Sequence, residues 1–300
     1  MPTAYDPGQG RWTPLAVFLV GAAIVNLTGP SLSWALLSPF FVSLVTGAVA
    51  AELGLLAIWT ALGAGRWTLR IPLTYFLAVL CFMLLVMGFN MGRMGPLQSG
   101  EVLDGLALLP LVFLAAQLPL WIVRLIFGWR IVFGDVEEEP DAEVGQFGIG
   151  HLLGATALVA VSLGLAQLGS IEAGPLRSSD AAWLDMLVAC GIVALVSALS
   201  TIPCVWAVLI SRRPLPAVWV IAAYTLAAAV VLAFVQTALT GVGDIWAEIL
   251  VLHLFALGAL MATMLIGLGV VHFFGYEMLR RGRKPRNGKP LEGLRHGYEE

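Results

Sequence analysis

Long apolar stretches separated by short polar segments dominate the pattern of this chain. A helix needs about 20 apolar residues to cross the hydrocarbon core of a bilayer. The stretches are continuous, whereas a strand of a membrane barrel alternates apolar and polar positions. We therefore predict an all-α fold, a polytopic integral membrane helical bundle with about eight transmembrane helices. The predicted spans lie near residues 12–28, 35–62, 70–90, 105–127, 150–169, 183–210, 216–238 and 246–275.

Composition supports a membrane environment. Hydrophobic residues make up 59% of the 300 positions and charged residues 12%, with a mean hydropathy of +0.91. A soluble domain carries about 25% charged residues, so the lipid bilayer is the expected partner. A net charge of −3 gives no basic balance for nucleic acid. Cysteines occur only within apolar runs, which predicts buried thiols and neither a disulfide framework nor a metal site: Cys81, Cys190 and Cys204.

Basic residues gather in every second loop and in the C-terminal tail. Because cytoplasmic loops carry an excess of Lys and Arg, this alternation predicts that both termini are cytoplasmic. The tryptophans fall near the predicted span ends, as expected where amphipathic rings meet the headgroups. The basic residues concerned are Arg66, Arg70, Arg124, Arg130, Arg212, Arg213, Arg280, Arg281, Arg283, Lys284, Arg286 and Lys289.

The chain divides into two halves at an acidic, proline-containing segment, residues 135–143. An offset of 147 positions aligns Trp59 with Trp206, Arg66 with Arg213, and Phe127-Gly-Trp with Phe274-Gly-Tyr. Four spans in each half would keep the two repeats parallel, related by an axis along the membrane normal. We predict four segments: a first four-span half, an acidic cytoplasmic linker, a second four-span half and a basic cytoplasmic tail, at 1–134, 135–147, 148–278 and 279–300.

The residues around this junction form a distinctive pattern. Arg124-Leu-Ile-Phe-Gly-Trp-Arg130 closes one predicted helix, and Gln146-Phe147 with a later Leu-Leu and Leu-Val-Ala-Val161 opens the next. This pattern resembles uncharacterised multi-pass membrane proteins of planctomycete bacteria, over about forty residues. Gly150 stands where those proteins usually carry arginine. The resemblance implies a bacterial inner (cytoplasmic) membrane location and no known activity.

Glu52 is the most informative single residue. It lies roughly 15 Å from the cytoplasmic end of its span at about 1.5 Å per residue, and a charge at the centre of a span costs about 2.5–3.5 kcal/mol. Gly47, Ala51 and Gly54 form an adjacent stripe of small residues that allows close helix packing. Glu52 is either part of a functional site or a carboxyl that joins two helices. Leu199 occupies the equivalent position in the second half.

A second group of polar residues lies near the predicted outer ends of spans six to eight. Acidic groups at an outer surface can concentrate cations, and they can equally be ordinary helix-end residues left where Lys and Arg are depleted. These binding candidates are His253, Glu248, Asp244, Asp185 and Gln236.

Two further motifs suggest specific chemistry. His151 and His272 lie near cytoplasmic span ends and could ligate haem axially. Gly241-Val-Gly-Asp244 is similar to the GxGD motif of presenilin-like and prepilin-peptidase aspartyl proteases, which also need a second aspartate; Asp185 could supply it. Nucleotide-binding, zinc-protease and serine-hydrolase motifs are absent. The sequence thus assigns no catalytic residue, predicts no cofactor, and leaves enzymatic activity open.

Three functions remain open from the sequence. The first is translocation of a small solute or ion between the two four-helix halves. The second is a non-catalytic membrane scaffold or accessory subunit, whose protein partner, not identified by the sequence, would engage residues 135–143 or 280–300. The third is an intramembrane enzyme or b-type cytochrome. The basic tail is also expected to bind anionic lipid, at about 1 kcal/mol per basic residue near the surface.

Overall fold

The computed structural model describes residues 13–36, 38–63, 67–92, 99–133, 180–211, 214–240 and 246–279. These ranges are almost entirely helical, which confirms the all-α prediction, and six of their helices are long and apolar enough to cross a membrane. The predicted fifth span, 150–169, lies outside the described residues. The helices are α2 (Thr13–Leu36), α3 (Pro39–Leu62), α4 (Trp67–Gly92), α5 (Ser99–Phe127), α7 (Asp180–Val205), the short π-helix η2 (Trp206–Ile210), α8 (Pro214–Thr240) and α9 (Trp246–Phe273).

The first helix is longer than predicted. We expected it to end near residue 28, but α2 continues through Pro30 to Leu36. Proline lacks an N–H and removes one helical hydrogen bond, a loss that membrane helices tolerate when neighbouring groups compensate. The break falls instead at Ser38, and Pro39 begins α3 at a position where its missing N–H costs nothing.

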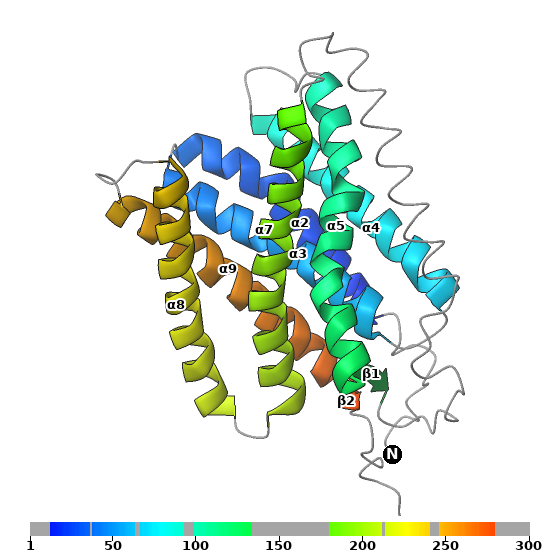
Figure 1. The fold of residues 1–300 in the computed structure, drawn as a ribbon. Coiled ribbons are helices and arrows are strands. Elements are labelled where there is room, and N and C mark those ends of the chain that lie inside the picture. Colours follow the sequence, from blue (N-terminus) through cyan, green and yellow to red (C-terminus); the bar gives the residue numbers. More distant parts are fainter. Residues whose placement is uncertain are drawn as a thin grey trace, which may run out of the picture.

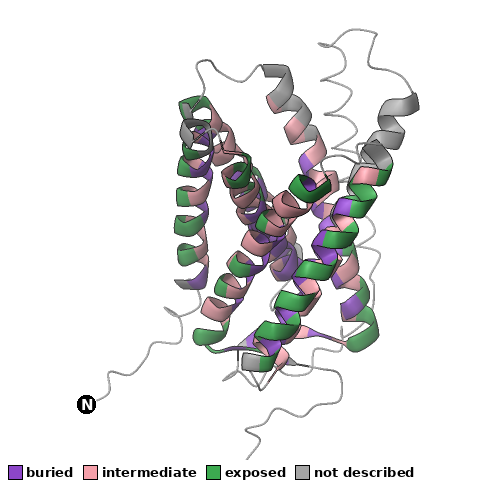
Figure 2. Ribbon diagram, turned by 90° about the vertical axis from the view of Figure 1, so that its left-hand side faces the viewer, coloured by how far each residue is buried: buried purple, intermediate pink, exposed green. Residues whose placement is uncertain are grey.

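The helices form two crossing layers (Figure 1). Helices α8, α7 and α5 stand side by side in front, while α4, α3, α2 and α9 pass obliquely behind them. The two layers meet where α8 packs against α9 and where α5 packs against α3. Figure 2 shows buried positions gathered at these crossings and exposed positions on the outer faces.

Helices α3 and α9 run in the same direction and pack very closely. The Phe40 and Phe255 rings meet at one end, with centroids 5.4 Å apart, and Trp59 meets Tyr276 at the other, 6.2 Å apart. Between them, a Cβ atom added to Gly47 would lie 2.0 Å from the carbonyl oxygen of Ala256. The small-residue stripe predicted on this helix is therefore its contact with α9, as expected for close packing between membrane helices.

The outer faces of the helices are apolar. Leu69 is 73% exposed, Phe234 is 69% exposed and Phe273 is 85% exposed. Monomeric soluble proteins rarely expose contiguous apolar patches on this scale. Lipid tails are the environment that such faces require, so the lengths, composition and surface of the helices agree with a membrane-spanning protein.

Two short strands close one end of the bundle. Strand β1 (Arg130–Phe133) follows α5 and strand β2 (Tyr276–Leu279) follows α9. Each helix is followed by a glycine with positive φ, Gly128 at 62° after α5 and Gly275 at 87° after α9. This backbone conformation favours glycine. The strands pair antiparallel. We predicted that the last span would continue to residue 275, but the helix ends at Phe273 because the chain turns at Gly275 into β2.

The residues paired at the centre of this ribbon are separated by the same 147 positions that align Trp59 with Trp206. Ile131 lies opposite Met278, and these two positions are 147 residues apart. The pair Arg130 and Leu279 on one side corresponds, under the same offset, to the pair Val132 and Glu277 on the other. The ribbon therefore has a local twofold axis midway between Ile131 and Met278, and the rotation exchanges its two strands.

Candidate functional site

A carboxyl and an amide are paired in the interior of the bundle. The side-chain nitrogen Nδ2 of Asn26, in α2, donates a hydrogen bond of 2.6 Å to Oε2 of Glu52, in α3. Asn26 is fully buried and Glu52 is 4% exposed. Both residues lie well inside helices long enough to cross a membrane. Glu52 therefore has a defined polar partner, and that partner comes from the preceding helix.

Asn26 is held by an unusual contact between α2 and α4. Pro30 has no N–H, so the backbone carbonyl of Asn26 lacks its usual partner four residues later. Gly88 of α4 lies against this carbonyl, and a Cβ at Gly88 would come within 2.1 Å of the oxygen. Ser31 donates a hydrogen bond of 3.1 Å to the carbonyl oxygen of Gly88. The proline and the glycine together bring α4 close to the amide.

Glu52 lies inside the first half of the chain. Its partner is on α2, and Cys81 of α4 lies within electrostatic reach of its carboxyl group. Gly47 and Gly54, by contrast, contact Ala256 and Met264 of α9. Helix α3 thus presents Glu52 to α2 and α4 and presents its small-residue stripe to α9.

The pair is incompletely satisfied. Among the described residues, neither Oδ1 of Asn26 nor Oε1 of Glu52 has a hydrogen-bond partner, although both atoms are buried. Both are acceptors when Glu52 is ionised. A buried polar atom without a partner costs about 1–3 kcal/mol, so the arrangement favours any state that supplies a donor between them.

Three of the residues predicted near the end of α8 and the start of α9 are described, and no hydrogen bond links them to this pair. His253 is half-buried in α9, while Glu248 and Gln236 are exposed. Asp185 belongs to α7, but the structure does not describe its side chain. Asp244 and the rest of the Gly241–Asp244 motif lie outside the described residues. The binding site suggested for these residues therefore stays a prediction.

The two histidines predicted as haem ligands are not seen together. His151 lies outside the described residues. His272 is exposed near the end of α9, with Nδ1 3.3 Å from the carbonyl oxygen of Tyr276. Among the described residues, no group of three or more His, Cys, Asp or Glu side chains could hold a metal ion. The acidic linker and the basic tail, on which a scaffold function would depend, are also outside the described ranges.

Sequence reasoning singled out Glu52 but missed Asn26. An asparagine within the apolar run Gly21–Leu27 is itself a signal, because polar side chains inside a span are costly unless they are paired. Gln117 of α5 is a second buried amide that was missed, and its Oε1 accepts a hydrogen bond of 3.4 Å from the ring nitrogen of Trp121. Which helices meet was not visible in the sequence.

Comparison with known proteins adds no relative. No protein-family description, no curated protein and no solved structure matches this chain. The function must therefore be argued from the carboxyl–amide pair and the architecture that surrounds it.

Proposed function

We propose that this protein translocates a small solute or ion across a membrane and that Glu52 takes up and releases a proton during the cycle. The observation that carries the proposal is the buried Asn26–Glu52 pair, with one unsatisfied acceptor on each side chain. Ionisable residues inside membrane spans commonly mark ion pathways and proton relays. An apolar side chain would fill the space between α2 and α3 at lower cost.

The chemistry of the pair links protonation to helix packing. A proton added to Oε1 of Glu52 turns that oxygen into a donor, and Oδ1 of Asn26 is the acceptor left without a partner. The amide and the acid then exchange two hydrogen bonds. Loss of the proton leaves two buried acceptors, a state that requires a cation or a rearrangement of α2 against α3. Proton transfer and movement of these helices are thereby coupled.

We propose that the chain crosses the membrane eight times. Helices α5 and α9 run directly into the ribbon, Trp59 near the end of α3 contacts Tyr276 of β2, and η2 at the end of α7 lies beside β2. Consecutive spans normally alternate in direction, yet α5 and α7 both end at the ribbon. The chain between Phe133 and Asp180 must therefore return to the opposite end, which supports one further crossing there.

We also propose that these spans form two tandem halves of four spans each. The twofold register of the ribbon supports this division. So does the layer arrangement: the offset between the halves relates α3 to α7, α4 to α8 and α5 to α9, so that it exchanges the front helices with the rear ones. The contact of α3 with α9 in the rear layer and that of α5 with α7 in the front layer are exchanged as well.

We place the ribbon end in the cytoplasm of a bacterium, with both chain termini on that side. The basic loops support this orientation, since Arg70, Arg124 and Arg130 lie at the ribbon end. The resemblance of residues 124–161 to planctomycete membrane proteins supports an inner-membrane location. Arginine enrichment at this end is the expected mark of a cytoplasmic face.

Proton movement in proteoliposomes tests the translocation function. A pH-sensitive dye is enclosed in the vesicles, and alkali cations, amino acids, sugars and carboxylates are added outside in turn. We expect at least one solute to change the internal pH with the unaltered protein, and none to do so with Glu52→Gln. Gly258→Ala is the control variant, because its new Cβ would meet open space. Equal proton movement with Glu52→Gln and the unaltered protein would contradict the proposal.

A further inference from the structure

Three arginines gather at the ribbon end of the bundle. Arg70 lies in the first turn of α4, Arg124 in the last turn of α5, and Arg130 begins β1. Their charges act on one another: Arg70 is within reach of Arg124 and Arg130, and Arg124 is within reach of Arg130. Arg70 is 5% exposed, whereas Arg124 and Arg130 are half-buried. We call Arg70, Arg124 and Arg130 the arginine cluster.

The end of α3 holds two members of the cluster. Arg124 donates a hydrogen bond of 2.5 Å to the carbonyl oxygen of Ala61, and Arg70 donates to the carbonyl oxygen of Gly63. The last carbonyls of a helix have no helical partner and carry a partial negative charge. Arg124 also lies 5.8 Å from the centre of the Trp121 ring. These contacts fix the positions of the guanidinium groups but neutralise little of their charge.

The described part of the chain supplies no carboxylate that pairs with the cluster. Glu277 lies diagonally across the ribbon from Arg130, is exposed, and forms no ion pair with it there. The Nε atom of Arg70 is buried and has no hydrogen-bond partner among the residues that the structure describes. Charged groups are almost never buried unless they are paired, so a buried arginine beside two others indicates that an anion completes this site.

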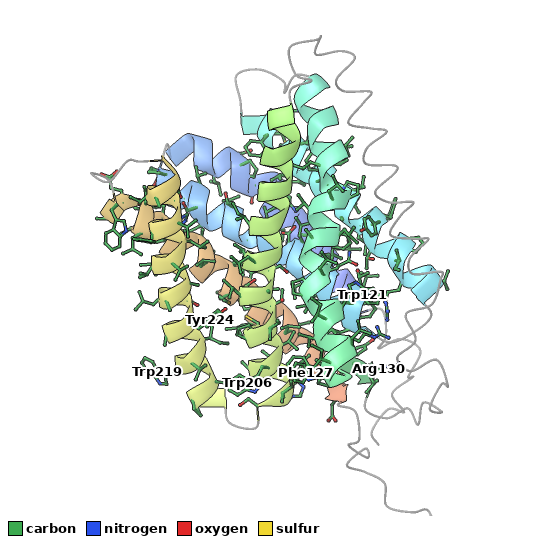
Figure 3. The ribbon with its side chains drawn as sticks, viewed as in Figure 1. Trp121, Phe127, Arg130, Trp206, Trp219 and Tyr224 are labelled. Carbon is green, nitrogen blue, oxygen red and sulfur yellow. The ribbon has the colours of Figure 1, made fainter. Side chains whose placement is uncertain are left out.

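The cluster lies at the level where helices leave the membrane. The apolar segment of α4 begins at Leu69, the residue before Arg70. The apolar segment of α5 ends at Phe127, three residues after Arg124. Tryptophans mark the same end of the bundle: Figure 3 shows Trp206 and Trp219 near its lower end together with Phe127 and Arg130, and Trp121 above them. Exposed apolar side chains beside the cluster, Leu69 and Phe127, offer a surface for acyl chains.

We propose that the arginine cluster binds the phosphate group of an anionic phospholipid. Arg124 and Arg130, which are half-buried, contact the phosphate oxygens, and Arg70 adds positive charge from beneath and orients the other two. Guanidinium groups match the geometry of phosphate through paired hydrogen bonds. Cationic pockets between helices on the cytoplasmic side are a known type of lipid headgroup site. A lipid fits better than free phosphate because the apolar surface adjoins the charges.

Native mass spectrometry of the detergent-solubilised full chain tests this site. Phosphatidylglycerol, phosphatidylcholine or inorganic phosphate is added in separate titrations. We expect phosphatidylglycerol to be retained most strongly and inorganic phosphate neither to be retained nor to displace it. Each of Arg124→Gln and Arg130→Gln should weaken retention about fivefold, the effect of about one basic residue near an anionic surface. Arg213→Gln, which removes a basic residue between η2 and α8 in the sequence, is the matched control and should change retention less than twofold.

A second measurement separates binding from folding. Phosphatidylglycerol should raise the melting temperature of the unaltered protein more than phosphatidylcholine does, and Arg124→Gln should lose this difference even if its own melting temperature falls. Neutralising the acidic linker, with Glu137→Gln, Glu138→Gln and Glu139→Gln together, should leave retention unchanged. Equal retention of the two lipids, equal losses with Arg213→Gln, displacement by inorganic phosphate, or stronger lipid retention after the linker is neutralised would each overturn the proposal.

Discussion

Ile131 of β1 and Met278 of β2 lie opposite each other in the antiparallel ribbon, and 147 positions separate them in the chain. The same offset aligns Trp59 with Trp206 and Arg66 with Arg213. An antiparallel pair in which a residue faces its own counterpart has a twofold axis at that point. The ribbon thus joins the end of α5 to the end of α9, close to where α3 and η2 also end.

Replacing either of the two glycines that precede the strands should cost a similar free energy of unfolding. Gly128 and Gly275 both have positive φ, and a side chain in that conformation costs about 1–2 kcal/mol. We expect Gly128→Ala and Gly275→Ala each to lower the free energy of unfolding in mixed micelles by that amount. Gly191→Ala, in the middle of α7 where a Cβ meets nothing within 4 Å, is the control and should not destabilise. A neutral effect at either ribbon glycine would count against the observed turn.

The α3–α9 contact should tolerate no added methyl group at its centre. Gly47→Ala would place a Cβ 2.0 Å from the carbonyl oxygen of Ala256, which belongs to the backbone and cannot rotate away. Overpacking of this kind costs about 1–3 kcal/mol. Thermal unfolding should therefore show a clear loss of stability for Gly47→Ala and none for Gly258→Ala, a control on α9 with open space around it. Equal stability of the two variants would mean that the helices are not in contact at Gly47.

The chain should change sides of the membrane between Phe133 and Asp180. In a background without Cys81, Cys190 and Cys204, single cysteines are placed as Glu139→Cys and Glu172→Cys. A membrane-impermeant thiol reagent should label the first from the cytoplasmic side and the second from the opposite side. Labelling of both from one side would contradict eight spans, because α5 and α7 would then have to end at opposite faces.

Asn26 and Glu52 should show coupled energetics. Asn26→Leu leaves the buried carboxyl without its donor, and Glu52→Leu leaves the buried amide without its acceptor, each at a cost of about 1–3 kcal/mol. Replacement of both residues removes both unsatisfied acceptors of the pair. The double variant should therefore be more stable than the sum of the single losses predicts, by about 0.5–3 kcal/mol, in unfolding measurements. Additive losses would show that the two side chains do not interact.

The sequence was sufficient to predict the helical class, because span length and apolar composition are local properties. The position of Glu52 within a span was visible for the same reason. Its partner was not, because pairing with Asn26 depends on how α2, α3 and α4 pack, and helix contacts in lipid depend on small residues such as Gly88 more than on hydrophobic pattern. Asn26 lies within an apolar stretch and was not singled out from the sequence as a polar residue inside a span.

The ribbon was missed for a different reason. The repeated Phe-Gly-aromatic segments were noticed as an alignment marker, but both were assigned to helix ends. Arg130-Ile-Val-Phe133 contains β-branched and aromatic residues after a glycine, a recognised strand signal. Four residues are too few to predict a strand with confidence in a helical chain, since a strand this short forms only when a partner such as β2 is brought beside it.

Infrared difference spectroscopy of the protein in lipid bilayers tests the central claim most directly. The C=O stretching band of protonated carboxyl groups is followed while the pH of the bathing buffer is cycled. We predict a reversible band that disappears in Glu52→Gln and shifts in frequency in Asn26→Leu, because the amide is the hydrogen-bond partner of that carboxyl. Spectra that are the same in the unaltered protein and in Glu52→Gln would show that Glu52 exchanges no proton, and would contradict its role in translocation.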